Sequence, residues 1–277
     1  MMDVLGDNYS IRSRCKVLGL RRQTYHRRKG GHRPERADDG LRKLLHTLTG
    51  QYIAWGFWMI FHYLRNEGFV WNHKRVYRVW KEEKLNLRKV PKRPKIKRVF
   101  LDLIAPNNIN EGWAMDFLSE WVVGVEEQGV RIINIIDECS RRALWTEAHY
   151  SITGKILIQV LEKVITWRGK PSYIRCDNGP EFICQEIKDW AEQQGIEIRH
   201  IQPGKPTQNG IIERLNGTLR TECLNLEWFG TLDYLNQKLQ EWWMIYNEHR
   251  PHSSIKYLTP ALFEQKNHLL YFNLVAA

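Results

Sequence analysis

The sequence has few cysteines, and its apolar runs are short. Its five cysteines are odd in number and no two have Cys-x-x-Cys spacing: Cys15, Cys139, Cys176, Cys184 and Cys223. This pattern excludes a disulfide scaffold and a cysteine zinc finger. No run reaches the ~18 apolar residues of a membrane span, and the first residues lack the apolar segment of a secretion signal. We therefore expect a cytoplasmic protein with reduced cysteines and no membrane partner.

Acidic residues are scarce in the first third of the chain. Residues 1–99 hold 25 Lys and Arg against 8 Asp and Glu, a net charge of +17, whereas residues 100–277 carry −6. A basic arm indicates attraction to a polyanion, and an acidic body suits chemistry that depends on cations. The alternative is a basic arm that only aids solubility, but this alternative does not explain why the positive and negative charges are separated along the chain.

Two small helical modules are predicted in the basic part. Residues 10–29 have the spacing of two short helices around Gly19, which is helix-turn-helix spacing, although a plain basic helical pair would show it too. The second helix would present basic residues to DNA: Arg21, Arg22, Arg27, Arg28 and Lys29.

The second module is predicted at about 41–88. Asn72 is an expected helix N-cap, and Val76, Val79 and Trp80 form an apolar stripe behind it. Other faces of this helix carry Lys74, Arg75, Arg78 and Lys81. The run at 88–98 is basic and proline-rich, which predicts a linker along a phosphate backbone.

From residue 111 the pattern becomes that of an α/β domain. Three strand-like runs are followed by a helix at 153–167, a strand ending at Asp177, a helix at 180–194, a further strand, and a helix that begins near 208–210. The order predicts a ribonuclease H-like core, a mixed five-stranded sheet flanked by helices. We expect four parts: a helix-turn-helix arm at 1–40, a second helical DNA-binding module at 41–98, the core at 105–225, and a helical extension at 226–277.

Three acidic residues lie at positions of the predicted core where a carboxylate could bind a ligand. Asp116 lies within an apolar strand, Asp177 ends a strand before a helix, and Glu213 lies on a polar helix face, with 35 residues between the last two. Strand ends and polar helix faces are where α/β sheets bind ligands. Alone, Asp116 and Glu213 are better explained as solvated acids. As a trio they predict a two-metal site that cuts nucleic acid.

Other polar residues have simpler interpretations. His249 and His252 lack a cysteine pair, so we expect structural or backbone contacts rather than zinc ligation. Glu162 lies on the polar side of its predicted helix and is expected to be solvated.

The chain resembles the transposases of bacterial insertion sequences, DDE recombinases with a retroviral-integrase-type core. The matching stretches are WAMDF, RCDNGPEF, PGKPTQNGIIERLNGTLRTECLN and YNEHRPHSSIKYLTPALF, and WNHKRVYRVWKEEKLNLR resembles the preceding DNA-binding region. Within that family it is most similar to the second-frame product of two-frame elements. In the helix before Asn72, AWGFWMIFHYL departs from the more basic family pattern by exchanging charge for Trp and Met.

The resemblance implies a function and a set of partners. Asp116, Asp177 and Glu213 would be the catalytic acids and the ligands of two magnesium ions, with manganese as a substitute. Asp137 matches the family pattern without being a catalytic acid. Partners would be double-stranded DNA at terminal inverted repeats and at the target, further copies of the chain, and a fused upstream-frame product, in the nucleoid of a bacterial cytoplasm. Contacts to the terminal DNA are expected near the Glu: Lys205, Gln208, Asn209, Arg214 and Arg220.

Two other functions compete with this one. A DNA-binding regulator would share the basic arm but would not need three placed acids. A ribonuclease H-type nuclease that only hydrolyses would share the acids, whereas the YNEHRPHSS segment and the DNA-binding arm argue against it.

Overall fold

The structure is a computed structural model that describes residues 10–17, 19, 21–22, 38–87, 106–124, 127–202 and 209–275, without the side chains of 14, 180 and 268–275. The chain divides into two compact units, Met1–Leu44 and Leu45–Ala277. The first contains α1 (Ile11–Val17), which confirms the first predicted helix, and Gly19 follows it with a φ of 61°. The predicted second helix, with Arg27 and Arg28, lies outside the described residues. The four-part division stays a prediction.

The basic module contains three helices, α3 (Asp39–Gln51), α4 (Phe57–Asn66) and α5 (His73–Glu82). The side chain of Asn72 accepts a hydrogen bond from the backbone of Lys74 and caps α5, as predicted. Val76, Val79 and Trp80 are buried, which confirms the apolar stripe.

A mixed five-stranded sheet forms the core, which confirms the predicted ribonuclease H-like class. Its order is β3-β2-β1-β4-β5. The antiparallel strands are β1 (Gly112–Val123), β2 (Glu127–Asp137) and β3 (Ala143–His149), while β4 (Tyr173–Cys176) and β5 (Glu197–His200) run parallel to β1. The antiparallel meander follows from the few residues that separate β1 from β2 and β2 from β3, and the parallel strands require the helical crossovers between them.

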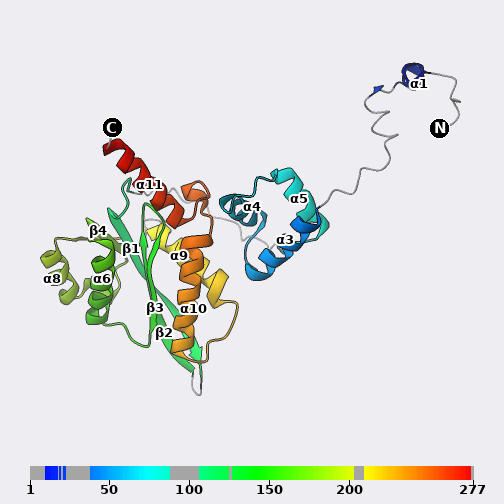
Figure 1. The fold of residues 1–277 in the computed structure, drawn as a ribbon. Helices are drawn as coiled ribbons and strands as arrows, with labels where there is room; N and C mark the ends of the chain where they lie inside the picture. The colour runs from blue at the N-terminus through cyan, green and yellow to red at the C-terminus, as the bar shows by residue number, and fades with distance from the viewer. Residues whose placement is uncertain are drawn as a thin grey trace. The chain divides into compact units, whose positions relative to one another are not determined.

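Helices cover both faces of the sheet, with α6 and α8 on one face and α9 and α10 on the other (Figure 1). Alternation along β1 supplies both cores, since Met115 packs on the side of α6 and Ala114 on the side of α9. The helices are α6 (Gly154–Arg168), α7 (Pro180–Ile183), α8 (Gln185–Gln194), α9 (Gly210–Leu219), α10 (Leu232–Met244) and α11 (Pro260–Val275), with π-helical turns at Arg220–Leu224 and Ile245–His249 and a 3₁₀ turn at Ser253–Ile255.

One predicted helix is broken in two. The sequence predicted a continuous helix at 180–194, but Cys184 is extended, with φ −63° and ψ 152°, and separates α7 from α8. A straight helix would place Phe182 and Ile187 about 140° apart around its axis. The break allows both side chains to be fully buried in one core.

Candidate active site

Asp116 and Asp177 are placed side by side by the pairing of β1 with β4. The parallel register joins Trp113 to Ile174 and Ala114 to Arg175. Continued by two residues, it sets Asp116 opposite Asp177, one residue beyond the end of β4, at the roughly 4.8 Å spacing of neighbouring strands. Asp116 lies on the same side of β1 as Ala114 and Leu118, as alternation predicted.

Helix α9 brings Glu213 toward the same sheet face. Ile212, Leu215 and Leu219 are buried against the sheet, which fixes the rotation of the helix and leaves Glu213 exposed. Asn216, one turn further along, donates a hydrogen bond from Nδ2 to Asp116 Oδ2 at 2.7 Å. Because residues three apart share a helix face, this bond also sets the position of Glu213 relative to Asp116.

Asn134, a third polar residue, connects strand β2 to Asn216 and Asp116. Asn134 of β2 is the cross-strand partner of Asp116, and its Nδ2 donates to Asn216 Oδ1 at 2.8 Å. Asn134 is fully buried, and its own Oδ1 has no partner. Buried amides are costly unless they are hydrogen-bonded, so the relay Asn134–Asn216–Asp116 constrains the carboxylate strongly.

The three acids interact electrostatically. Burial, as the larger cause, together with the negative charges of Asp177 and Glu213, raises the pKa of Asp116 to about 6. The hydrogen bond from Asn216 opposes this rise. A group of like charges that raises a carboxyl pKa is an arrangement that a cation would relieve.

The donor chemistry of the trio fits a hard divalent cation. Carboxylate oxygens are the ligands that magnesium prefers, and magnesium keeps several waters, so few protein ligands suffice. Within the described part of the chain, no three His, Cys, Asp or Glu side chains are already gathered closely enough to hold a metal. The three acids are therefore electrostatic neighbours rather than a closed ligand cage.

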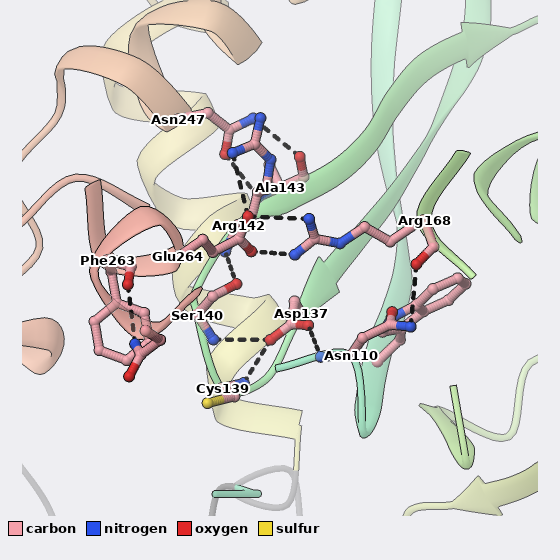
Figure 2. A network of polar contacts seen from close by, with 12 residues as sticks. Asn110, Asp137, Cys139, Ser140, Arg142, Ala143, Arg168, Asn247, Phe263 and Glu264 are labelled. Atoms are coloured by element: carbon pink, nitrogen blue, oxygen red, sulfur yellow. Dashed lines mark hydrogen bonds and ion pairs between the residues drawn. The ribbon is translucent and has the colours of Figure 1, made fainter. Parts of the chain in front are cut away.

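Asp137 belongs to a separate, structural network (Figure 2). It is fully buried, and its carboxylate accepts hydrogen bonds from the backbone amides of Asn110, Cys139 and Ser140 at 2.6–2.9 Å. Nearby, the buried Glu264 of α11 is ion-paired with Arg142 and Arg168. Asp137 Oδ1 is engaged by the β2–β3 turn and Oδ2 by Asn110, so its carboxylate joins this turn to the segment before β1.

The structure confirms the expected exposure of Glu162 and the expected backbone contact of His252. Glu162 is exposed, and all five cysteines are unpaired. His252 is buried and contacts the backbone oxygen of Tyr246 through Nε2 at 3.3 Å, and burial lowers its pKa to about 3. Every helix that the structure describes is too short or too polar to cross a bilayer.

The predicted DNA-contact residues are found in different settings. Arg21, Arg22, Lys74, Lys81 and Arg214 are exposed. Arg75 and Arg78 are half-buried, Arg78 paired with Glu82. Arg220 donates to the backbone of Ser119, and Asn209 is buried. Arg27, Arg28, Lys205 and Gln208 lie outside the described residues. These contacts all stay predictions.

The sequence analysis did not predict the two asparagines of the relay. It placed Glu213 on a polar helix face without naming Asn216, and it did not single out Asn134. The hairpin offered a signal for Asn134, because pairing Gly112–Val123 with Glu127–Asp137 places it opposite Asp116.

Models of known protein families match most of the chain. Two models of the integrase core domain match residues 106–206 and 194–260, and a model of an HTH-like domain matches residues 38–95. The HTLV-2 integrase catalytic core domain, solved in complex with magnesium in a dimeric form, is similar with a TM-score of 0.41 and 20% identity, over 55% of this chain and 94% of that one.

Relatives from insertion elements match almost the whole chain. The uncharacterized 31.7 kDa protein of insertion element IS407 from Burkholderia multivorans is 33% identical over 260 residues, 94% of this chain and 92% of that protein. Transposase InsD for insertion element IS2D from Escherichia coli is 25% identical over 245 residues, 83% of this chain and 80% of that protein. The chain therefore belongs to the transposases of insertion elements that carry an integrase core.

Proposed function

We propose that Asp116, Asp177 and Glu213 hold two magnesium ions, with manganese as a substitute, and that the chain cuts and joins DNA at the ends of an insertion element. The observation that carries this proposal is the hydrogen bond from Asn216 to Asp116, which holds the helix that carries Glu213 against the strand that carries Asp116, where the charges of Asp177 and Glu213 also act. A cation would relieve the repulsion that Asp177 and Glu213 exert on Asp116, and a two-metal site is suited to in-line phosphoryl displacement.

When bound, the metal ions would polarise the phosphoryl oxygens and stabilise charge on the attacking and leaving oxygens. The protein would contribute by positioning the three carboxylates that hold these ions. Asp116 must lose its proton to act as a ligand, and Asn216 then holds its Oδ2 in a fixed direction. Asp177 presents its carboxylate from a strand end, and Glu213 from a helix anchored on the sheet.

Both reactions replace one P–O bond of a DNA phosphodiester with another P–O bond. In the first, water attacks phosphorus, the 3′ oxygen leaves and takes up a proton, and a 3′-hydroxyl and a 5′-phosphate result. In the second, that hydroxyl attacks another phosphodiester, loses its proton, and displaces a second 3′ oxygen. No bond between protein and DNA is needed, because each step exchanges one P–O bond for another.

We further propose the partners of this reaction. Terminal inverted repeats would be bound by the basic modules and by residues near Glu213, among them Arg214 and Arg220. Two ends must meet for joining, which calls for more than one copy of the chain. Fusion with an upstream-frame product, and action on the nucleoid in the cytoplasm, belong to the same proposal.

Cleavage and joining of a labelled element-end duplex test the proposal. Wild-type protein with magnesium should release the 3′ end and transfer it to a second duplex, whereas Glu213→Gln should do neither. Glu162→Gln is the matched control, because Glu162 is an exposed helical glutamate on α6. Full activity of Glu213→Gln would refute the assignment, and hydrolysis without joining by the wild type would favour a nuclease.

A further inference from the structure

We propose that a cavity beside α9 binds one phosphate group of the DNA backbone between the guanidinium groups of Arg141 and Arg214. This inference rests on the proposed function, and it adds a binding site separate from the three acids. Both arginines line the cavity together with Ser253 and Ser254. Its volume of about 540 Å³ is within the roughly 300–1,000 Å³ of pockets that hold small molecules, so a phosphodiester group fits.

The positive charge in this cavity is not neutralised. Among the described residues, no carboxylate pairs with Arg141 or Arg214, and Arg141 Nη1 is buried without a hydrogen-bond partner. Of the described residues that line the cavity, none is acidic. Arg141 and Arg214 line the same cavity and repel each other, an anion between them would relieve this repulsion, and phosphate matches their planar donor geometry.

The other basic residues of the cavity are already engaged. Arg250 binds both carboxylate oxygens of Glu222 through Nε, at 2.9 and 3.0 Å. The buried His252 is neutral because burial lowers its pKa to about 3. The uncompensated charge is therefore that of Arg141 and Arg214.

The backbone holds Arg141 in place. It follows Asp137 in the β2–β3 turn, its N–H donates to Asp137 O at 3.0 Å, and its φ of 63° lies in the left-handed region. A non-glycine residue in that conformation persists only where surrounding contacts impose it. Here the network around Asp137 imposes it and directs the arginine from a rigid turn.

Helix α9 connects this cavity to the acids. Gly210, Arg214 and Thr218 are four residues apart along one stripe and line the cavity. Glu213 lies about 100° around the helix from Arg214 and Asn216 about 160°, and Asn216 reaches Asp116. A phosphate bound at Arg214 would therefore lie close to the DNA strand whose scissile phosphate is at Glu213. The spacing between the two residues would then fix the position of the cut along that DNA strand.

The test measures DNA binding without divalent metal, so that catalysis plays no part. Binding of a fluorescent element-end duplex is followed by anisotropy between about 50 and 200 mM salt, for wild type, Arg141→Gln, Arg214→Gln and the double variant. Each lost phosphate contact lowers the slope of log K against log salt by about 0.9. Because both arginines share one phosphate, each single variant should lose about 0.9, and the double variant should lose no more.

Three further samples make the result decisive. Lys188→Gln removes one exposed positive charge from α8 and should keep the wild-type slope. Arg141→Lys keeps the charge and should retain most of the slope, which separates charge loss from misfolding. Inorganic phosphate alone should shift the melting temperature of the wild type less than the duplex does.

The outcomes separate the cavity from the wider function. Wild-type binding with unchanged slopes in both single variants, or losses that add in the double variant, would overturn the shared phosphate site and leave the transposase assignment standing. Unchanged slopes with strong stabilisation by inorganic phosphate would mean that the cavity takes free phosphate instead of DNA. Failure of the wild type to bind the duplex at all would refute the proposed function itself.

Discussion

The side-chain amide of Asn216 donates a hydrogen bond to the carboxylate of Asp116 across 2.7 Å, joining α9 to the central strand of the sheet. The donor is on the same helix face as Glu213, so one bond relates the positions of two of the three acids. Metal sites commonly depend on such outer partners, which orient the ligand carboxylates.

Asn216→Ala should lower the free energy of unfolding by about 1–3 kcal/mol, because Asp116 loses a donor and the buried amide of Asn134 loses its acceptor. Affinity for magnesium, measured by calorimetry, should fall as well. Asn225→Ala is the control, since Asn225 is exposed at the end of the π-helical turn after α9. Equal losses in urea denaturation for the two variants would show that the relay contributes no stability.

Asp116→Asn should stabilise the protein at pH about 8 without divalent metal. The folded-state pKa of Asp116, about 6, lies above its ordinary value of 3.8, so the folded state binds the proton more tightly. The stability gained from protonation is present below pH about 4 and is lost as pH rises through about 6.

Asparagine mimics the protonated acid and can still accept the bond from Asn216. The gain should be at most about 3 kcal/mol, and it should shrink below pH about 6. Asp189→Asn, at an exposed position on α8, should show no such pH dependence. Thermal melting across pH measures both, and an Asp116→Asn protein less stable than wild type at pH about 8 would contradict the account.

Glu264→Ala should lower the free energy of unfolding by about 3–5 kcal/mol, because the largely buried Arg168 would lose its ion-pair partner and Arg142 would keep only Glu248. Glu248 also pairs with Arg142, at 3.3 Å, but it is exposed. Glu248→Ala should therefore cost less than about 1 kcal/mol. Urea denaturation compares the two, and a similar cost for both would show that the ion pairs at Glu264 do not anchor α11.

Much of the fold could be predicted from periodicity. Alternation in β1 placed Asp116 on the side opposite Met115, and the apolar stripe of α5 placed Val76, Val79 and Trp80 inside. The break at Cys184 could not be predicted, because burial of Phe182 and Ile187 in one core overrides local helix propensity.

The candidate site was predictable only in part. The spacing of the acids and the strand end at Asp177 are local features, and the sequence alone predicts them. The bond between Asn216 and Asp116 joins residues 100 positions apart, and the cavity joins Arg141 to Ser253 and Ser254. Such contacts depend on how α9 and the C-terminal segment pack on the sheet, which no local pattern specifies.

The most direct test of the central claim is anomalous diffraction from crystals soaked in manganese. The account predicts anomalous peaks between the carboxylates of Asp116 and Asp177, with Glu213 beside one of them, and their loss in crystals of Asp177→Asn. Peaks confined to other carboxylates, or peaks that persist unchanged in Asp177→Asn, would contradict it.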